Sequence, residues 1–344
     1  MGIGFNADLP VTELVRKAQF AEGLGYDSFW MHEHSFGRDA ISFLSSISSN
    51  TSRIKLGAAC LSPYTRHPVV LAMSMLTLQE SSSGRAILGL GSGFPARLDL
   101  LGINHERPIG TIRETIEICR TLWSGDALSY SGRNFSLKGV KSIAGKAHSK
   151  IPVYIAGWKK QMLALAGRYA DGYVAKGGES IHSIRQITSS IEASASKWGR
   201  RLSDIDISAY LLTYVGGSKE EALGTARRDP FVNYMLSVQD DYLYEGTGID
   251  PAKKKPIAEN YFKGDITASS SFITDEMLEA FTLVGTGEQV CDRVQEFKKS
   301  GLNLPILQPI SMKAQDIDTV LRAGAMLIGE DEKGEYAATQ RAPK

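Results

Sequence analysis

The chain has 344 residues, of which 42% are hydrophobic and 22% are charged. This composition is typical of a globular protein with a large buried core, and the length allows either two ordinary domains or one α/β barrel of about 250 residues with insertions. Lys and Arg number 39 against 38 for Asp and Glu, a net charge of +1, which excludes a global attraction for nucleic acid or for an anionic membrane.

Short apolar or β-branched runs alternate with longer stretches of helical period along the chain. In the first helical stretch, 11–23, Leu14, Ala18 and Ala21 lie on one face, and a proline suited to a first turn opens another helix at 108–123. The eight candidate strands are 2–7, 27–31, 54–61, 85–91, 151–156, 172–175, 205–212 and 304–309.

This alternation is typical of parallel strands joined by crossover helices. Eight such strands close more readily as a barrel than as an open sheet, so we predict a (β/α)8 TIM barrel, with a doubly wound sheet as the alternative.

Two segments interrupt the alternation. Residues 125–150, which contain LSYSGRNFSL, predict a small hairpin, whereas residues 228–280 are long, aromatic and irregular. Long insertions are usually lids, binding loops or interfaces, so we place both around the mouth of the barrel. One barrel domain is expected over 1–330, followed by a loosely ordered tail at 331–344.

The cysteines and the first residues bear on the cellular setting. Cys60, Cys119 and Cys291 are far apart and form no CxxC pair, which favours a reducing, intracellular environment. The start, MGIGFNADLP, has no basic leader or long apolar core, and no stretch approaches the roughly 20 apolar residues of a membrane span. We expect a cytoplasmic protein.

The second predicted strand ends in His32-Glu33-His34, and the chemistry of a barrel lies where its strands end. One hypothesis is that Glu33 and His34 face the ring of a cofactor or substrate and supply a hydrogen bond or a proton. In the alternative, His34 caps the next helix and Glu33 is solvated, while His32 has a structural role. Metal binding is disfavoured because adjacent strand residues point to opposite faces and no third ligand cluster is visible.

Small residues follow the third and fourth predicted strands, at Ala59 and Cys60 and at Gly91, Ser92 and Gly93. Small residues permit close approach of a flat ligand, although they also ease packing. Cys60 is expected to be a buried, unreactive thiol. The GLGSG run lacks the spacing of a dinucleotide-binding motif, so a Rossmann site is disfavoured.

Glycines and lysines follow the fifth and sixth predicted strands, at Gly157 and Trp158 and at Lys176, Gly177 and Gly178. Unpaired amides at a helix N-terminus beside a lysine favour an anion such as phosphate. An ordinary turn with a solvated lysine is the alternative for each loop. Together the two loops favour a phosphorylated cofactor.

The chain resembles the bacterial luciferase-like superfamily, and within it the coenzyme F420-dependent branch that includes methylenetetrahydromethanopterin reductase. The resemblance rests on GIGF, LGAACLSPYTRHP, GRAILGLGSGFPARLDLLGINHERPIGTIRETIEICRTLWSGD, IPVYIAGWKKQMLALAGRYADGYV and FTLVGTGEQVCDRV. It implies the barrel fold, a homodimer or higher homo-oligomer, and F420 at the C-terminal mouth, with Glu33 and His34 at its ring.

The resemblance also implies a cis peptide bond between Ala59 and Cys60, in a bulge that supports the ring. F420-dependent members usually carry Asp-His at the end of the second strand, whereas many flavin monooxygenases carry Glu-His, as this chain does. Phe94 and Gly4 stand where the reductase has acidic residues. The resemblance therefore leaves the substrate open.

Three functions follow from these patterns. The first is an F420-dependent oxidoreductase that transfers hydride between the deazaflavin and a small organic substrate, with Tyr210, Tyr214 and Trp158 as candidates for the substrate wall. The second is an FMN-dependent monooxygenase. The third is a non-catalytic flavin-binding barrel.

Overall fold

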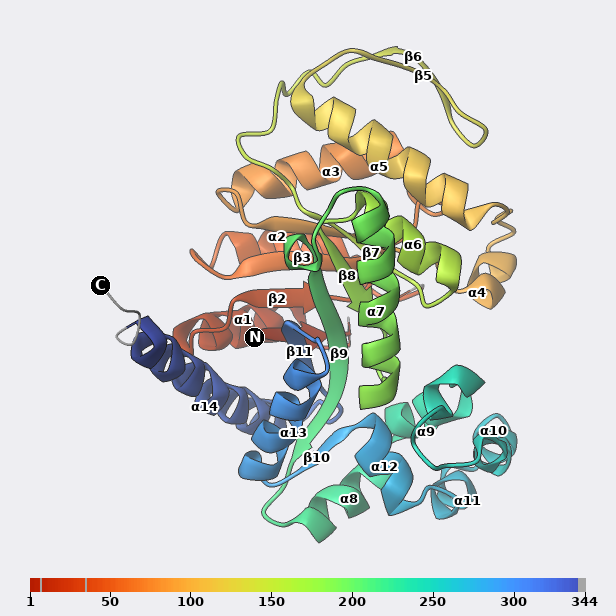
Figure 1. Ribbon diagram of the computed structural model, residues 1–344, viewed down its shortest axis with the longest axis vertical. Helices are drawn as coiled ribbons and strands as arrows, with labels where there is room; N and C mark the ends of the chain where they lie inside the picture. Colours follow the sequence, from red (N-terminus) through yellow and green to blue (C-terminus); the bar gives the residue numbers. More distant parts are fainter. Residues whose placement is uncertain (7, 35, 340–344) are drawn as a thin grey trace.

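The computed structural model describes residues 1–6, 8–34 and 36–339, and parallel strands lie at its centre (Figure 1). The barrel strands are β1 (Gly2–Phe5), β2 (Ser28–Met31), β3 (Lys55–Leu61), β4 (Ala86–Leu90), β7 (Val153–Ala156), β8 (Gly172–Ala175), β9 (Asp206–Val215) and β11 (Leu304–Pro309). Each pairs with the next, and β11 pairs with β1. The predicted TIM barrel is confirmed, and the open-sheet alternative is wrong. Ala7, the last residue of the first predicted strand, lies outside the described residues.

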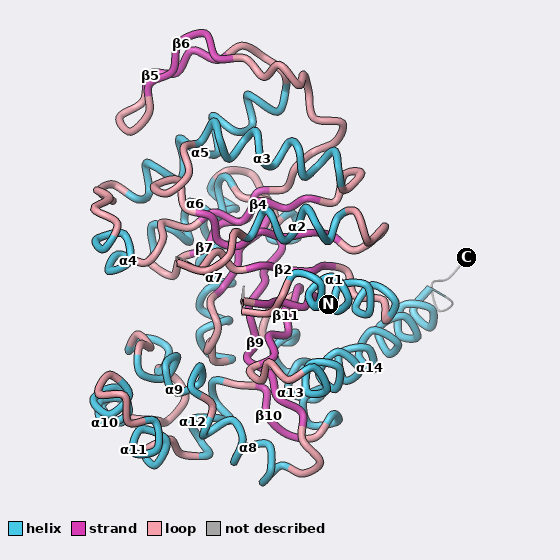
Figure 2. The backbone as a smooth tube through the Cα atoms, turned by 180° about the vertical axis from the view of Figure 1, so that it is seen from behind, coloured by secondary structure: helices cyan, strands magenta, loops and turns pink. Residues whose placement is uncertain are grey.

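Helices surround the barrel, as the view from behind shows (Figure 2). The covering helices are α1 (Val11–Gly23), α2 (Ala40–Ser48), α3 (Pro68–Ser81), α5 (Pro108–Ser124), α6 (Lys160–Tyr169), α7 (Ile181–Lys197), α13 (Gly287–Lys299) and α14 (Ala314–Thr339), with the short α4 (Pro95–Leu100) and η1 (Leu202–Asp204) between them. The predicted face of α1 is buried, and Pro108 opens α5. Both helix predictions are confirmed.

The strands alternate between two packed layers. Trp30, Tyr154, Tyr210 and Ile306 belong to a cluster that fills the barrel interior. Their strand neighbours, such as Met31, belong to the larger cluster that packs against the helices. Because side chains alternate along a strand, a residue two positions beyond an interior residue again faces the interior, one layer nearer the mouth.

The first insertion is the predicted hairpin, formed by β5 (Leu128–Ser131) and β6 (Ser136–Val140), and it lies outside α5 (Figure 1). The carboxylate of Glu114 on α5 is buried and accepts hydrogen bonds from the backbone N–H groups of Arg133, Asn134 and Phe135 in the hairpin turn. The turn is therefore fixed to the first half of α5.

The second insertion was predicted to be irregular, and that prediction is wrong, because most of it is helical. After α8 (Lys219–Arg228) come α9 (Pro230–Ser237), η2 (Asp241–Tyr244), η3 (Pro251–Lys253), α10 (Lys254–Tyr261), α11 (Ile266–Ser271), α12 (Asp275–Phe281) and the short strand β10 (Leu283–Gly285). These helices are too short to show a clear amphipathic period. Side-chain caps from Asp229, Asp265 and Thr274 begin three of them. They enclose a separate apolar cluster.

The expected tail also differs from the structure, because α14 continues as a helix to Thr339. Ile317, Val320 and Leu321 anchor its first half in the core, and the following residues are mostly good helix formers. Residues 340–344 of the predicted tail lie outside the described part of the chain.

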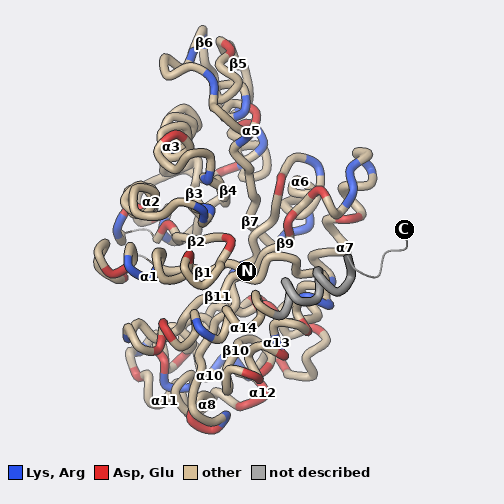
Figure 3. The backbone as a smooth tube through the Cα atoms, turned by 90° about the vertical axis from the view of Figure 1, so that its left-hand side faces the viewer, with Lys and Arg blue, Asp and Glu red and all other residues tan. Residues whose placement is uncertain are grey.

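Two further features are the distribution of charged residues and the apolar content of the helices. Lys and Arg are interspersed with Asp and Glu over the molecule (Figure 3), consistent with the near-zero net charge. No helix within the described residues has the length and apolar content that crossing a bilayer requires.

Candidate active site

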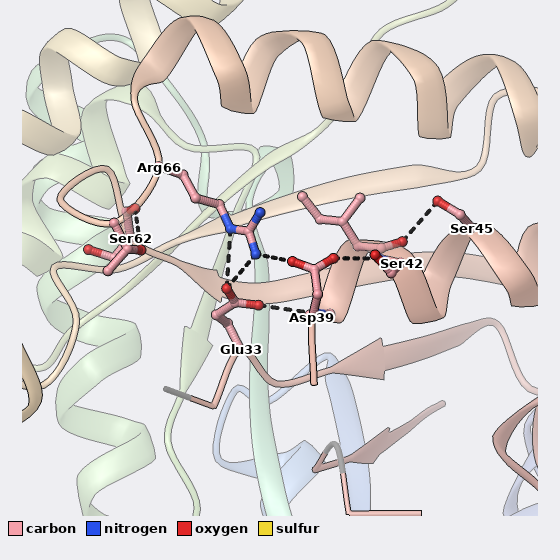
Figure 4. Close-up of polar contacts among 9 residues, drawn as sticks. Glu33, Asp39, Ser42, Ser45, Ser62 and Arg66 are labelled. Carbon is pink, nitrogen blue, oxygen red and sulfur yellow. Dashed lines mark hydrogen bonds and ion pairs between the residues drawn. The ribbon is translucent and has the colours of Figure 1, made fainter. Parts of the chain in front are cut away.

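Glu33 is held in an ion-pair cluster where β2 ends. Its Oε1 accepts hydrogen bonds from Arg66 Nη2 at 2.6 Å and Nε at 3.2 Å, and its Oε2 accepts one from the backbone N–H of Ala40 at 3.2 Å. The same Arg66 nitrogen pairs with Asp39, as the close-up shows (Figure 4). Arg66 therefore joins the loop after β3 to the loop that leads from β2 into α2.

Asp39, and not His34, caps α2, because its Oδ1 accepts the backbone N–H of Ser42 at 2.7 Å. Partial burial of Asp39 opposes its ionisation, but hydrogen bonds from Arg66 and Ser42 outweigh burial and hold the pKa of this carboxyl below its ordinary value. The alternative in which His34 is the cap and Glu33 is solvated is wrong on both points. The catalytic roles of the two residues stay predictions.

His34 is exposed, and its imidazole meets the segment that follows β4. Its Nε2 lies 3.0 Å from Nη2 of Arg97 on α4. A guanidinium only donates hydrogen bonds, so Nε2 accepts here and His34 is the neutral tautomer protonated on Nδ1. This contact orients the ring and leaves Nδ1–H as its donor.

The peptide bond between Ala59 and Cys60 is cis, as the resemblance implied, and the β3–β4 ladder shifts register around it. Gly89 of β4 and Gly91 just after it make room for this bulge: a Cβ at Gly89 would lie 2.7 Å from Ala59 Cβ, and one at Gly91 would lie 3.0 Å from Cys60 Cβ. Burial raises the pKa of the Cys60 thiol to about 12, so the thiol is neutral, as expected.

Ser92 and Gly93 extend this contact between the two strands. Ser62 Oγ donates to the carbonyl of Ser92 at 3.2 Å, and Gly93 has a φ of 81°, which favours glycine. Phe94, at 52% exposure, then leads into α4. The predicted small-residue positions of strands three and four therefore adjoin one another.

The two predicted anion-binding loops both contact the helical insertion. Trp158 stacks on Tyr242 of η2, with ring centroids 4.6 Å apart, and Lys176 Nζ lies 2.7 Å from a carboxylate oxygen of Asp240. The carbonyl of Gly178 accepts a hydrogen bond from Gln239 Nε2 at 3.1 Å. Lys176 is thus paired rather than solvated.

The glycines in these loops meet different demands. Gly157 has a φ of 134°, and a Cβ there would lie 2.8 Å from Met162 Cγ. A Cβ at Gly177 would lie 3.1 Å from Leu212 and 3.7 Å from Gln308 Oε1, so Gly177 lies against interior-facing residues of β9 and β11.

Glu179 was missed by sequence reasoning, because GGES resembles an ordinary turn before a helix. Its carboxylate is buried, accepting Ser183 Oγ–H at 2.6 Å and the Tyr242 hydroxyl at 3.3 Å. Burial raises the pKa of Glu179 to about 7, against the lowering effect of Ser183 and of the Lys176 charge. A carboxyl that titrates near neutral pH therefore joins the β8–α7 loop to the insertion.

Tyr210 fills the barrel interior beside Gly4. A Cβ at Gly4 would lie 2.5 Å from Cε1 of the Tyr210 ring, and the Tyr210 hydroxyl is 3.4 Å from the carbonyl oxygen of Ala59. Of the other candidates for the substrate wall, Tyr214 is buried in the apolar cluster of the insertion, and Trp158 is 37% exposed.

Metal binding has no support in the described part of the chain, which contains no group of three His, Cys, Asp or Glu side chains able to hold an ion.

Comparisons with known proteins give consistent matches. The model of the family described as "Luciferase-like monooxygenase" matches residues 4–304. The chain is 33% identical to the 5,10-methylenetetrahydromethanopterin reductase of Methanolobus tindarius over 88% of this chain and 91% of that protein. It is 30% identical to the F420-dependent glucose-6-phosphate dehydrogenase of Microbacterium testaceum, over 56% of this chain and 61% of that one. The solved coenzyme F420-dependent tetrahydromethanopterin reductase of Methanopyrus kandleri superposes with a TM-score of 0.87 at 27% identity, covering 94% of this chain and 97% of that one.

Proposed function

Because the chain belongs to the luciferase-like monooxygenase family, we propose that it is a coenzyme F420-dependent oxidoreductase that transfers hydride between the deazaflavin and a small organic substrate. The observation that carries the proposal is the similarity to the F420-dependent reductase of M. kandleri over 94% of the chain, with a TM-score of 0.87. A relative with another substrate, glucose 6-phosphate, is also named as F420-dependent. The cofactor is thus shared among relatives whose substrates differ.

The residues at the carboxyl ends of β3 and β4 fit a flat ring. Ala59 and Cys60 present a bulge without long side chains, and a Cβ on Gly91 beside them would crowd Cys60 Cβ at 3.0 Å. We assign this surface to the deazaflavin ring, which, when bound, supplies a carbon that carries hydride.

The phosphate side of the cofactor is assigned to the loops after β7 and β8. Gly157 and Trp158 form one loop, and Lys176, Gly177 and Gly178 form the other, ahead of the N-terminus of α7. Lys176 is paired with Asp240, so its charge is partly neutralised. We therefore assign most of the proposed attraction for phosphate to the backbone amides and the helix dipole.

His34 is the better candidate of the predicted pair for moving a proton. It is exposed, and its Nδ1–H has no hydrogen-bond partner among the described residues while Arg97 holds Nε2, whereas both oxygens of Glu33 are engaged. We propose that Glu33 acts through Arg66, which fixes the loop that carries His34.

The test compares F420 with FMN in the same preparation. F420 binding is expected to change the cofactor's absorbance and fluorescence saturably, and a His34→Ala variant is expected to bind F420 but lose turnover. Preferential FMN binding with oxygen consumption would instead establish the monooxygenase that the Glu33-His34 pair suggests. Binding of neither cofactor would favour the non-catalytic barrel, and full turnover by the His34 variant would remove that residue from the mechanism.

We expect this chain to use the cofactor of the reductase relatives but not their substrate. Gly4 stands where the resemblance implies an acidic residue, and the ring of Tyr210 occupies the space that its side chain would need. We propose a different small organic substrate for this chain.

Three further expectations belong to this proposal: one barrel domain over 1–330 with its two insertions, a homodimer or higher homo-oligomer, and a cytoplasmic location. Light scattering coupled to gel filtration measures the assembly directly, and a monomer at micromolar concentration would contradict it.

A further inference from the structure

His32 lies in the interior layer at the mouth of the barrel. It comes two positions after Trp30, an interior residue, and its backbone N–H donates to the carbonyl of Phe5 at 3.0 Å, so strand pairing with β1 extends to this point. Its imidazole packs on the ring of Tyr210, with centroids 3.9 Å apart and planes 33° apart. Tyr210 in turn reaches the Ala59 carbonyl, so His32 is one side chain away from the proposed ring surface.

The two ring nitrogens of His32 have different surroundings. Burial lowers the pKa of His32 to about 4, although a hydrogen bond with the Gln308 side chain opposes this. The Nε2 atom is buried and has no hydrogen-bond partner among the described residues. The contact with Gln308 therefore belongs to Nδ1.

The direction of this hydrogen bond fixes the tautomer. Gln308 Nε2 donates to Asn6 Oδ1 at 3.5 Å, which leaves Gln308 Oε1 to accept from His32 Nδ1–H. A neutral imidazole protonated on Nδ1 carries a lone pair on Nε2. A buried acceptor without a donor costs about 1–3 kcal/mol, so a ligand that donates to it is favoured.

The described groups around His32 carry no charge that would compensate a proton on its ring. Burial raises the pKa of Tyr210 and of Cys60, so both are neutral, and Asn6 and Gln308 are neutral amides. Among the described residues, a positive charge on His34 would further oppose protonation of His32. An anionic or cationic substrate group buried here would lack a counterion.

We propose that His32 Nε2 accepts a hydrogen bond from a neutral hydroxyl or N–H group of the substrate, and that this contact selects neutral donors over carbonyl-only and anionic compounds. The inference rests on the proposed function, which places the cofactor ring beside Tyr210. It makes His32, together with Gln308 and Asn6, the polar floor of the substrate site.

Nitrogen NMR of protein labelled at histidine tests the tautomer first, before cofactor is added. The His32 resonances, assigned by their loss in His32→Gln, are expected to show a protonated Nδ1 and an unprotonated Nε2 from pH 5.5 to 8. A proton on Nε2, or a charged ring in this range, would overturn the proposal.

The second stage uses the F420-bound protein and three small probes: propan-2-ol, acetone and acetate. Propan-2-ol is expected to shift the Nε2 resonance saturably, whereas acetone and acetate leave it unchanged. His32→Phe is expected to weaken propan-2-ol binding, followed by F420 fluorescence, about fivefold, the loss of one net hydrogen bond. His32→Gln is expected to retain most of the affinity.

A matched control removes another buried, unpartnered polar atom. Thr188 Oγ1 on α7 also has no partner among the described residues, and Thr188→Val is expected to leave propan-2-ol affinity unchanged. An equal response to acetone, or an Nε2 shift produced by F420 alone, would show that His32 Nε2 does not recognise a donor group of the substrate and would overturn the proposal. Failure of F420 to bind would refute the proposed function while leaving the tautomer measurement intact.

Discussion

The Glu179→Gln variant is expected to become more stable than the wild type as the pH rises. Glutamine keeps the size and hydrogen-bonding capacity of a protonated carboxyl, so it resembles the form of Glu179 that the buried site favours. Ser183 Oγ donates to Oε2 at 2.6 Å and the Tyr242 hydroxyl donates to Oε1 at 3.3 Å, so in the variant one hydroxyl can donate to the amide oxygen while the oxygen of the other can accept from the amide NH2.

The magnitude follows from the raised pKa. The pKa moves from an ordinary value of 4.5 to about 7, which corresponds to about 3 kcal/mol in the free energy of unfolding. Between these two values the unfolded chain has lost the Glu179 proton while the folded chain retains it, so wild-type stability falls as the pH rises through this window. Below it the wild type and the variant differ little, and above pH 7 the difference is complete.

Thermal unfolding from pH 4.5 to 8.5 measures the difference. For a chain of 344 residues, about 3 kcal/mol corresponds to a rise of about 4 °C in Tm at pH 8. Glu192→Gln, on the same helix but exposed, serves as the control and is expected to follow the wild type at every pH. A Tm difference that does not change with pH, or a Glu179→Gln variant less stable at pH 8, would refute the reasoning.

Three further predictions concern the barrel and its mouth. Gly4→Ala is expected to lower stability by about 1–3 kcal/mol in urea unfolding, because its Cβ would lie 2.5 Å from the Tyr210 ring; unchanged stability would show that the ring moves freely. Arg66→Gln is expected to lose about 1–3 kcal/mol in the free energy of unfolding at pH 7 and less at about pH 3, because Arg66 lowers the pKa of Asp39 and this contribution is lost as the pH falls below the ordinary value of that carboxyl; an equal loss at both pH values would contradict the pairing. Lys176→Ala is expected to weaken F420 binding about fivefold by fluorescence titration, and unchanged affinity would exclude the Lys176 side chain from the phosphate site.

The barrel could be predicted because each strand carries its own local signal. Apolar runs of four to eight residues between helical stretches predicted all eight strands, and β8 and β11 were predicted with the observed bounds. The hairpin also has a local signal, in its turn residues. The helices of the second insertion do not, since each has only six to eight residues and depends on the apolar cluster they build together.

The candidate site was predicted less well, because its contacts join residues distant in sequence. Nothing near Lys176 indicates that Asp240 neutralises it, and nothing near Glu33 indicates that Arg66 engages it. The cis bond after Ala59 came from the resemblance and not from residue patterns. Long-range pairs of this kind form when the barrel closes. The sequence alone predicts the order of the strands but not which loops meet.

The interior of the barrel relates the proposed cofactor site to the proposed substrate site within one scaffold. The bulge at Ala59 is accommodated by Gly89 of β4 and by Gly91 just after it, and it meets the side of the interior formed by β1, β2, β9 and β11 where the Tyr210 hydroxyl lies 3.4 Å from the Ala59 carbonyl oxygen. On that side, the lack of a side chain at Gly4 makes room for the Tyr210 ring, and the imidazole of His32 packs on that ring. These positions are coupled: an acidic residue at position 4 would displace Tyr210, and His32 would lose its packing. The proposed substrate site therefore depends on a set of residues that must change together, and it meets the proposed ring surface where the Tyr210 hydroxyl contacts the Ala59 carbonyl.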